Sequence, residues 1–403
     1  MARALDGIRV VDLTVWFQGP VCSQHLADFG AEVIHVERPG SGDQGRGVAS
    51  IKALPMGDWN HYFGVTNRNK KSLALNLKKR EGREILYRLI EKSDVFLSNL
   101  TPERLEGMNL TYEKLSEINP RLVYTTNTGY GRRATVSKPS FDLTVQALTG
   151  VMARLGEPGQ PPVYLGMGSG DALGGLMSAL GIVLALHQRL LSGEGQHVDA
   201  SLYGAQLYLA APMLQAFLAT GRDRYSEQQT RKAAPNPLWN RYAASDKWLF
   251  LCVENDDPSW SQLCETLGDS RLSQDPRFAS ADGRRQHAAD LIAALDEVIA
   301  KDTADAWMER WRPLGIAASP IQTMDEVSRD PQAWENDYFA KMYSEEAQRE
   351  ITVRGLPVTL GKTPAAMESL GPELGQHTEL ILADTLGLSW DRIGELKAQG
   401  VIP

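Results

Sequence analysis

The stretch IRVVDLTVWFQGPVCSQHLADFGAEVIHVE (8–37) decides the fold of this chain. Its two ends, 8–14 and 32–37, are short apolar runs typical of buried strands, and 19–30 between them has helical spacing. Because helical segments go on alternating with strand candidates, the sequence predicts an α/β fold with a doubly wound, mainly parallel, Rossmann-like sheet. The further strand candidates are 71–77, 94–99 and 122–131, with a helical segment at 80–93.

The second half of the chain changes character after a long apolar segment. Residues 173–191 have the pattern of a buried helix, and the polar, proline-bearing stretch 220–237 is typical of a linker. The block 238–325 combines a strand candidate at 247–255 with several helical segments. We therefore expect a smaller α+β domain after the linker.

Composition narrows the class of protein. The 403 residues carry a formal net charge of −8, with 42% hydrophobic and 23% charged residues. This amino-acid composition is typical of a globular protein. Because the net charge is negative, nucleic acid is an improbable partner. The N-terminal segment does not resemble a secretory signal, and the longest apolar run, near 180–186, is short for a membrane span. We expect a cytoplasmic protein without a membrane partner.

Common catalytic motifs are weak or missing. GYGRRA (129–134) matches a dinucleotide-binding fingerprint, but Pro139 interrupts the helix that should follow. The three cysteines and seven histidines have no metal-ligand spacing, and no nucleophile-elbow motif occurs. The strongest candidate is MGSGDALGGL (167–176), in which Asp171 precedes the long apolar helix. The residues alone leave three roles open for Asp171: helix cap, part of a phosphate loop, or nucleophile.

Blocks along nearly the whole chain resemble the class III CoA-transferase family, typified by formyl-CoA and carnitine CoA-transferases. LDGIRVVDLT (5–14), LADFGAEVIHVERPGSGD (26–43), NRNKKSLALNLK (67–78), GSGDALGGLMSALGIVLAL (168–186) and RGLPVTLGKTP (354–364) occur in the family's order. The resemblance implies an interlocked homodimer whose large domain uses both chain ends. It also implies that the substrates are an acyl-CoA and a carboxylic acid, with coenzyme A as substrate and product and without a metal or redox cofactor.

With this resemblance we expect three segments: a large CoA-binding domain at 1–225, a small domain at 226–328, and a C-terminal segment at 329–403 that returns to the large domain. Asp171 matches the family's catalytic carboxylate, which attacks the thioester of an acyl-CoA and forms a mixed anhydride. Asp171 can cap its helix as well, and a helix start favours its ionised form. The surrounding glycines leave room for an acyl group; they are Gly168, Gly170, Gly174 and Gly175.

The resemblance also assigns further site residues. Gln18 is expected to stabilise the oxyanion or hold the anhydride, as a second catalytic residue. Trp16, Phe17 and Trp239 are candidates for the wall of an acyl pocket, although aromatic residues lie more often in a core. The residues expected to bind CoA are Arg38, Leu73 and Leu75 near the adenine, together with Asn99, Arg104 and Lys138.

Three alternatives remain open at this stage. The α-methylacyl-CoA racemases of the same family have His-Asp where this chain has Phe141-Asp142, so the second base of a racemase is missing. CoA transfer between two carboxyls of one dicarboxylate needs the same nucleophile as transfer between two molecules. A non-catalytic acyl-CoA-binding protein would lack the aspartate. Formate and oxalate are disfavoured as substrates, because 241–257 lacks the tetraglycine loop of the formyl-CoA enzymes.

Overall fold

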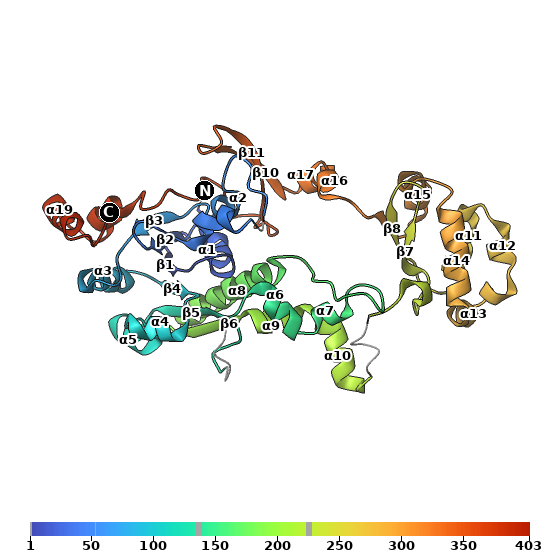
Figure 1. Cartoon of the computed structure of the whole chain (residues 1–403), viewed down its shortest axis with the longest axis horizontal. Coiled ribbons are helices and arrows are strands. Elements are labelled where there is room, and N and C mark those ends of the chain that lie inside the picture. The colour runs from blue at the N-terminus through green and yellow to red at the C-terminus, as the bar shows by residue number, and fades with distance from the viewer. Residues whose placement is uncertain (1, 53, 134–138, 223–227) are drawn as a thin grey trace. The chain divides into compact units, whose positions relative to one another are not determined.

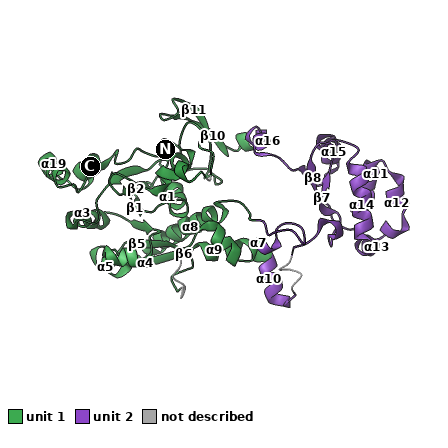
Figure 2. Ribbon diagram, in the orientation of Figure 1, with its two compact units in different colours: residues 1–152, 164–212, 332–403 green, residues 153–163, 213–331 purple. Residues whose placement is uncertain are grey.

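The computed structural model describes residues 2–52, 54–133, 139–222 and 228–403 and divides the chain into two compact units (Figure 2). Unit 1 comprises 1–152, 164–212 and 332–403, and unit 2 comprises 153–163 and 213–331. Unit 2 thus takes in two stretches, 153–163 and 213–225, that the sequence analysis assigned to the large domain.

The centre of unit 1 is a six-stranded sheet with the strand order β3-β2-β1-β4-β5-β6 (Figure 1). All five pairings are parallel, and this order is that of a doubly wound dinucleotide-binding fold. The predicted α/β class and parallel sheet are confirmed. The strands are β1 (Arg9–Leu13), β2 (Glu32–Glu37), β3 (Lys71–Ala74), β4 (Val95–Ser98), β5 (Val123–Thr128) and β6 (His197–Ser201).

Both faces of this sheet are covered, because successive strand side chains point to opposite sides. In β1, Val11 packs with α3, α5 and the C-terminal α19, whereas Val10 packs with α1 and α8. The chain end therefore contributes to the same core as the first strand. The helices of unit 1 include α1 (Gln18–Asp28), η1 (Gln44–Ile51), α2 (His61–Thr66), α3 (Arg80–Glu91), α4 (Pro102–Gly107), α5 (Tyr112–Ile118), α6 (Asp142–Leu148), α8 (Ser169–Ser192), α9 (Leu202–Leu209), α18 (Thr378–Leu380), η6 (Ile381–Thr385) and α19 (Trp390–Ala398).

Unit 1 also contains an antiparallel hairpin of β10 (Phe339–Ser344) and β11 (Arg349–Arg354). Three short helices lie at the borders of the two units: α7 (Val151–Arg154), α10 (Ala211–Thr220) and α17 (Pro331–Glu335).

Unit 2 packs helices around a three-stranded antiparallel sheet of order β7-β8-β9. The core contains Trp307 and Trp311, whose rings stack at 5.1 Å. Its strands are β7 (Trp239–Ala243), β8 (Trp248–Cys252) and β9 (Ala318–Pro320); its helices are η3 (Arg231–Ala233), α11 (Asp257–Leu267), α12 (Ser270–Gln274), η4 (Pro276–Phe278), α13 (Ala281–Gln286), α14 (Ala288–Ile299), α15 (Ala304–Trp311), η5 (Arg312–Leu314) and α16 (Met324–Ser328).

The long helix α8 differs from the expectation of a buried helix. One side packs against α1, β5, β6 and α9, but Leu180, Leu184 and Leu190 are more than half exposed. The prediction of full burial was wrong, because an apolar run alone does not show which side of a helix meets the core. By length and composition, α8 is the one helix among the described residues that could cross a membrane. Its packing in unit 1 is that of a core helix.

Candidate active site

Asp171 lies in the first turn of α8, two residues after the helix begins at Ser169. The residue at the N-cap position is Gly168, whose φ of 81° is in the left-handed region that glycine adopts without strain. The expectation that Asp171 caps the helix was therefore wrong. The apolar pattern indicated a start near residue 173, but the preceding glycine turn already leads into the helix.

A different carboxylate, Asp142 at the start of α6, binds the first turn of α8. Its Oδ2 accepts from the backbone N–H of Gly168 at 2.6 Å, and its Oδ1 accepts from that of Gly170 at 3.0 Å. The amides of Gln146 and Gln206 donate to the same carboxylate at 3.1 and 3.0 Å. Asp142 thus anchors the turn that carries Asp171. The sequence pointed to residue 142 only as the neighbour of a missing histidine, because the backbone groups that Asp142 binds, at Gly168 and Gly170, lie 26 and 28 residues away along the chain.

Burial, and after it the negative charge of Asp142, raises the pKa of Asp171 to about 7. This reverses the expectation that the helix start favours the ionised form. Two N–H groups of the first turn are engaged by Asp142, so the local negative charge outweighs the helix dipole. Among the residues that the structure describes, none donates a hydrogen bond to the Asp171 side chain.

The structure brings Gln18 to the same side of α8 as Asp171. Gln18 is the first residue of α1 and is buried, and a β-carbon at position 174 would lie 2.7 Å from its Nε2. Residues 171 and 174 are neighbours on one helix face. Nε2 of Gln18 is buried and has no hydrogen-bond partner within the described part of the chain. An unpartnered amide donor thus lies one helical turn from the carboxylate.

Two aromatic side chains surround the glycine turn. The Phe17 ring lies 3.5 Å from where a β-carbon of Gly168 would be, and its centroid is 5.4 Å from that of Tyr62. Burial, followed by the charges of Asp171 and Asp43, raises the pKa of Tyr62. Tyr62 therefore belongs to the surroundings of Asp171, although nothing in its sequence context indicated this.

Three side chains hold the loop before Gln18 by accepting hydrogen bonds from the backbone N–H groups of three successive residues. Asp12 accepts from the N–H of Thr14, Asn99 accepts from that of Val15, and Asp43 accepts from that of Trp16. Asn99 also donates to the Val15 carbonyl at 2.6 Å. The Asn99 amide, predicted to contact CoA, is therefore engaged with this loop on both its oxygen and its nitrogen.

The remaining predicted CoA-binding residues fall into three groups. Arg38, directly after β2, and Arg104 in α4 are exposed. Leu73 and Leu75 lie in the hydrophobic core with at most 1% exposure, so their side chains cannot touch a ligand, and only their backbone remains for the predicted contact. This burial could not be predicted from the sequence, because the resemblance implied which positions lie near the ligand but not the directions of their side chains. Lys138 lies outside the described residues.

No group of three or more His, Cys, Asp or Glu side chains in the described chain is arranged to hold a metal ion. The roles of the other predicted site residues stay predictions.

The family model for CoA-transferase family III matches residues 5–378. The chain belongs to this family. Among its relatives, the succinyl-CoA–D-citramalate CoA-transferase of Chloroflexus aurantiacus is 34% identical, over 99% of this chain and 98% of the relative. The (R)-2-hydroxy-4-methylpentanoate CoA-transferase of Clostridioides difficile is 30% identical over 99% of each chain. The protein is a class III CoA-transferase, an enzyme with CoA thioesters and acids as substrates.

The fold of this chain agrees with that of solved structures. A CaiB/BaiF family protein from Brucella suis superimposes with a TM-score of 0.84 at 30% identity, covering 95% of this chain and 100% of the other. The family assignment and the α/β class predicted from the sequence are both confirmed.

Proposed function

We propose that this CoA-transferase moves CoA from an acyl-CoA to a carboxylic acid through covalent intermediates on Asp171. The observation that carries the proposal is the position of Asp171: a carboxylate without a hydrogen-bond partner among the described residues, in a glycine-rich first turn beside the Gln18 amide. The glycines at 170 and 174 allow close packing around this turn, because a β-carbon there would collide with Gln206 and Asp142, or with Gln18.

The proposed exchange balances in four displacements. An Asp171 oxygen attacks the thioester carbonyl, the C–S bond breaks, and CoA thiolate leaves a mixed anhydride behind. The thiolate then attacks the aspartyl carbonyl and releases the donor acid, which gives an aspartyl-CoA thioester. The acceptor carboxylate attacks that thioester, and thiolate finally attacks the acceptor carbonyl, restoring Asp171. Each step exchanges one carbonyl substituent, so covalent catalysis divides a difficult exchange into easier ones.

The environment of Asp171 fits a nucleophile that works near neutral pH. A pKa of about 7 leaves a large fraction of the carboxylate ionised there. Every intermediate passes through a tetrahedral oxyanion, which a fixed N–H donor stabilises. The unpartnered Nε2 of Gln18 can supply that donor, and we assign Gln18 this role.

The position that would serve a racemase carries Phe141, whose side chain is 62% exposed. A phenyl ring has no proton to exchange, so transfer of CoA is preferred over racemisation. We assign binding of CoA to Arg38, Arg104 and Lys138 as the resemblance implies. The exposed apolar face of α8 supports a homodimer, because a buried subunit interface would remove that face from water.

The acceptor acid can be identified by testing a panel of acyl-CoA donors and free acids. Mass spectrometry detects the new CoA thioesters. The acids in the names of the two relatives, D-citramalate and (R)-2-hydroxy-4-methylpentanoate, belong in the panel, with a dicarboxylate half-thioester to detect transfer within one molecule. Asp171→Ala is expected to abolish exchange with every productive pair, and Gln18→Leu to lower kcat by about 100-fold. Unchanged exchange in Asp171→Ala would end the proposal.

A further inference from the structure

A buried cluster of charged side chains lies beneath the loop that carries Gln18. His35 and Asp12 are paired residues of the neighbouring strands β2 and β1, and both are fully buried. The cluster contains three carboxylates, all at most 4% exposed, and three basic groups. The carboxylates are those of Asp12, Glu37 and Asp43, and the basic groups are those of His35, Lys70 and Arg46.

Both ring nitrogens of His35 face carboxylate oxygens. Nδ1 lies 3.1 Å from Oδ2 of Asp12, and Nε2 lies 3.7 Å from Oδ2 of Asp43 and 4.0 Å from Oε1 of Glu37. In a neutral imidazole one nitrogen carries a lone pair, which a carboxylate oxygen would repel; in the imidazolium both nitrogens are donors. The negative charge around both nitrogens therefore favours the doubly protonated ring, in which neither nitrogen has a hydrogen-bond partner among the described residues.

The charge balance of the cluster leads to the same conclusion. Lys70 lies 3.1 Å from Asp12, and Arg46 contacts both oxygens of Glu37 at 2.7 Å. Those two cations leave one of the three buried carboxylates without a counterion unless His35 is charged, and an unpaired buried charge is costly. Burial lowers the pKa of His35, but the negative charge of Asp12 and the nearby carboxylates of Asp43 and Glu37 outweigh it and raise the pKa to about 9.

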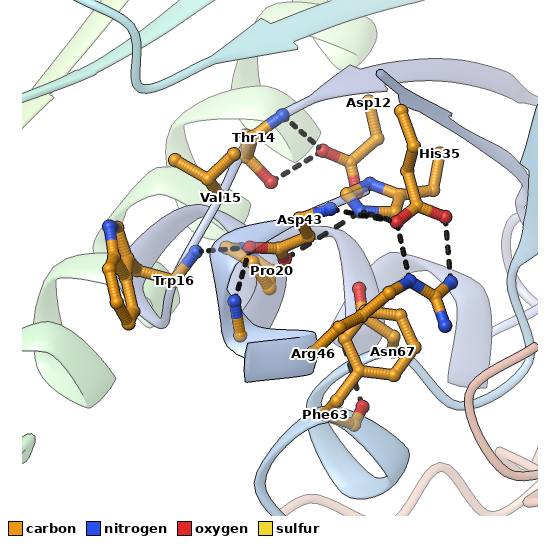
Figure 3. Close-up of polar contacts among 12 residues, drawn as sticks. Asp12, Thr14, Val15, Trp16, Pro20, His35, Asp43, Arg46, Phe63 and Asn67 are labelled. Atoms are coloured by element: carbon orange, nitrogen blue, oxygen red, sulfur yellow. Dashed lines mark hydrogen bonds and ion pairs between the residues drawn. The ribbon is translucent and has the colours of Figure 1, made fainter. Parts of the chain in front are cut away.

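Two of the three carboxylates that face His35 also hold the loop before Gln18. Asp12 Oδ1 accepts from both the backbone N–H and the hydroxyl of Thr14. Asp43 Oδ1 accepts from the N–H of Trp16, and Figure 3 shows Asp43 between that backbone nitrogen and His35. Asp43 Oδ2 has no hydrogen-bond partner in the described part of the chain, and the His35 ring lies 3.7 Å from it.

Trp16 needs such a hold, because its φ of 69° places a bulky residue in the left-handed region. This conformation is unfavourable for a non-glycine residue and persists only where its surroundings fix it. Residue 16 sets the direction of Phe17 and Gln18, which reach the first turn of α8.

We propose that His35 is a positioning residue: as an imidazolium it holds Asp12 and Asp43, and through them the Thr14–Gln18 loop that presents the Gln18 amide to Asp171. The proposal rests on the function proposed above, since it acts through Gln18. Charged groups from all elements around His35 take part: Asp12 on β1, Glu37 on β2, Asp43 before η1, Arg46 on η1 and Lys70 before β3.

The test compares His35→Gln, which is neutral, with His35→Lys, which keeps the positive charge. In His35→Gln we expect kcat to fall by about 10- to 100-fold with little change in the KM for acyl-CoA, because a small misplacement of a catalytic group costs that much. His35→Lys should recover most of the loss. His25→Gln is the matched control: His25 is also buried in unit 1 but does not touch the loop, and kcat should stay unchanged.

The pH profile separates positioning from a purely structural role. A raised folded-state pKa means that the charged ring is present below about 9 and lost above it. The kcat of the wild type should therefore decline as the pH rises through about 9. In His35→Lys this decline should move to higher pH, toward the ordinary lysine pKa of about 10.4. In His35→Gln the decline should be absent.

If His35→Gln fails to fold, as its circular dichroism spectrum would show, Asp43→Asn takes its place. It keeps the Oδ1 acceptor for Trp16 but removes a charge that His35 faces, so the alkaline decline should move to lower pH. Unchanged kcat and pH profiles in the folded His35 or Asp43 variants overturn the proposal. Trapping of an acyl group on Asp171 is measured in the wild type in parallel. If the acyl group is trapped but the His35 variants have unchanged kinetics, only the positioning role is rejected. If no acyl group is trapped, the proposed function itself is rejected.

Discussion

Gly170→Ala is the substitution that most directly perturbs the turn beneath Asp171. A β-carbon at residue 170 would lie 2.0 Å from Nε2 of Gln206 and 2.4 Å from Oδ1 of Asp142. Gln206 is fully buried and Asp142 is 5% exposed, so neither side chain can swing into solvent. The methyl group must therefore push the Asp142 carboxylate away from the N–H groups of Gly168 and Gly170.

The magnitude follows from two opposing effects. Alanine is more favourable than glycine within a helix by at most about 1 kcal/mol. Displacing Asp142 forfeits two hydrogen bonds to a charged acceptor, each contributing about 1.5–3 kcal/mol. We therefore expect Gly170→Ala to lower the free energy of unfolding by about 2–5 kcal/mol and to lower kcat/KM by displacing Asp171.

Urea unfolding and steady-state exchange kinetics check this expectation. Gly394→Ala is the matched control, because position 394 is exposed within α19 and a β-carbon there would meet no atom within 4 Å. It should be as stable as the wild type or slightly more stable, with unchanged kinetics. If Gly170→Ala behaved like Gly394→Ala, the role assigned to Asp142 would be wrong.

Four further predictions concern Asp171, Arg38 and Leu184. Below pH about 7 the exchange rate should fall about tenfold per pH unit, because only ionised Asp171 attacks. Because the pKa of Asp171 is raised by folding, the native state binds more protons than the unfolded state between pH about 4 and 7. Asp171→Asn should therefore raise the free energy of unfolding near pH 8 but not near pH 4. Arg38→Ala should raise the KM for acyl-CoA more than Arg38→Lys, with kcat nearly constant in initial-rate measurements. Leu184→Glu should shift the mass measured by light scattering from that of the proposed dimer to that of a monomer, whereas Leu314→Glu, also on an exposed leucine, should leave it unchanged.

The sequence predicted the parts of the fold that local patterns encode. The strand–helix–strand run at 8–37 gave β1, α1 and β2, and its continuation gave the parallel sheet. Periodicity could not show that one side of α8 stays exposed, nor that Leu73 and Leu75 face the core. These facts depend on which elements pack together, and that information is distributed over the whole chain.

The candidate site was predictable only in part for the same reason. Asp171 is found by its glycine-rich context and the family resemblance. The anchoring carboxylate of Asp142 and the buried ring of His35 act on residues far away in the sequence, at separations that follow from tertiary structure. The raised pKa of Asp171 likewise depends on burial and on Asp142, which the helix-start argument did not include.

The central claim is that an acyl group and then CoA become bonded to Asp171 during turnover. The most direct measurement adds hydroxylamine to the enzyme with acyl-CoA and maps the peptides by mass spectrometry. The account predicts a hydroxamate at Asp171 that requires acyl-CoA and is missing in Asp171→Asn. An unmodified Asp171 peptide from enzyme that is actively exchanging CoA, or a hydroxamate on another carboxylate, would contradict it.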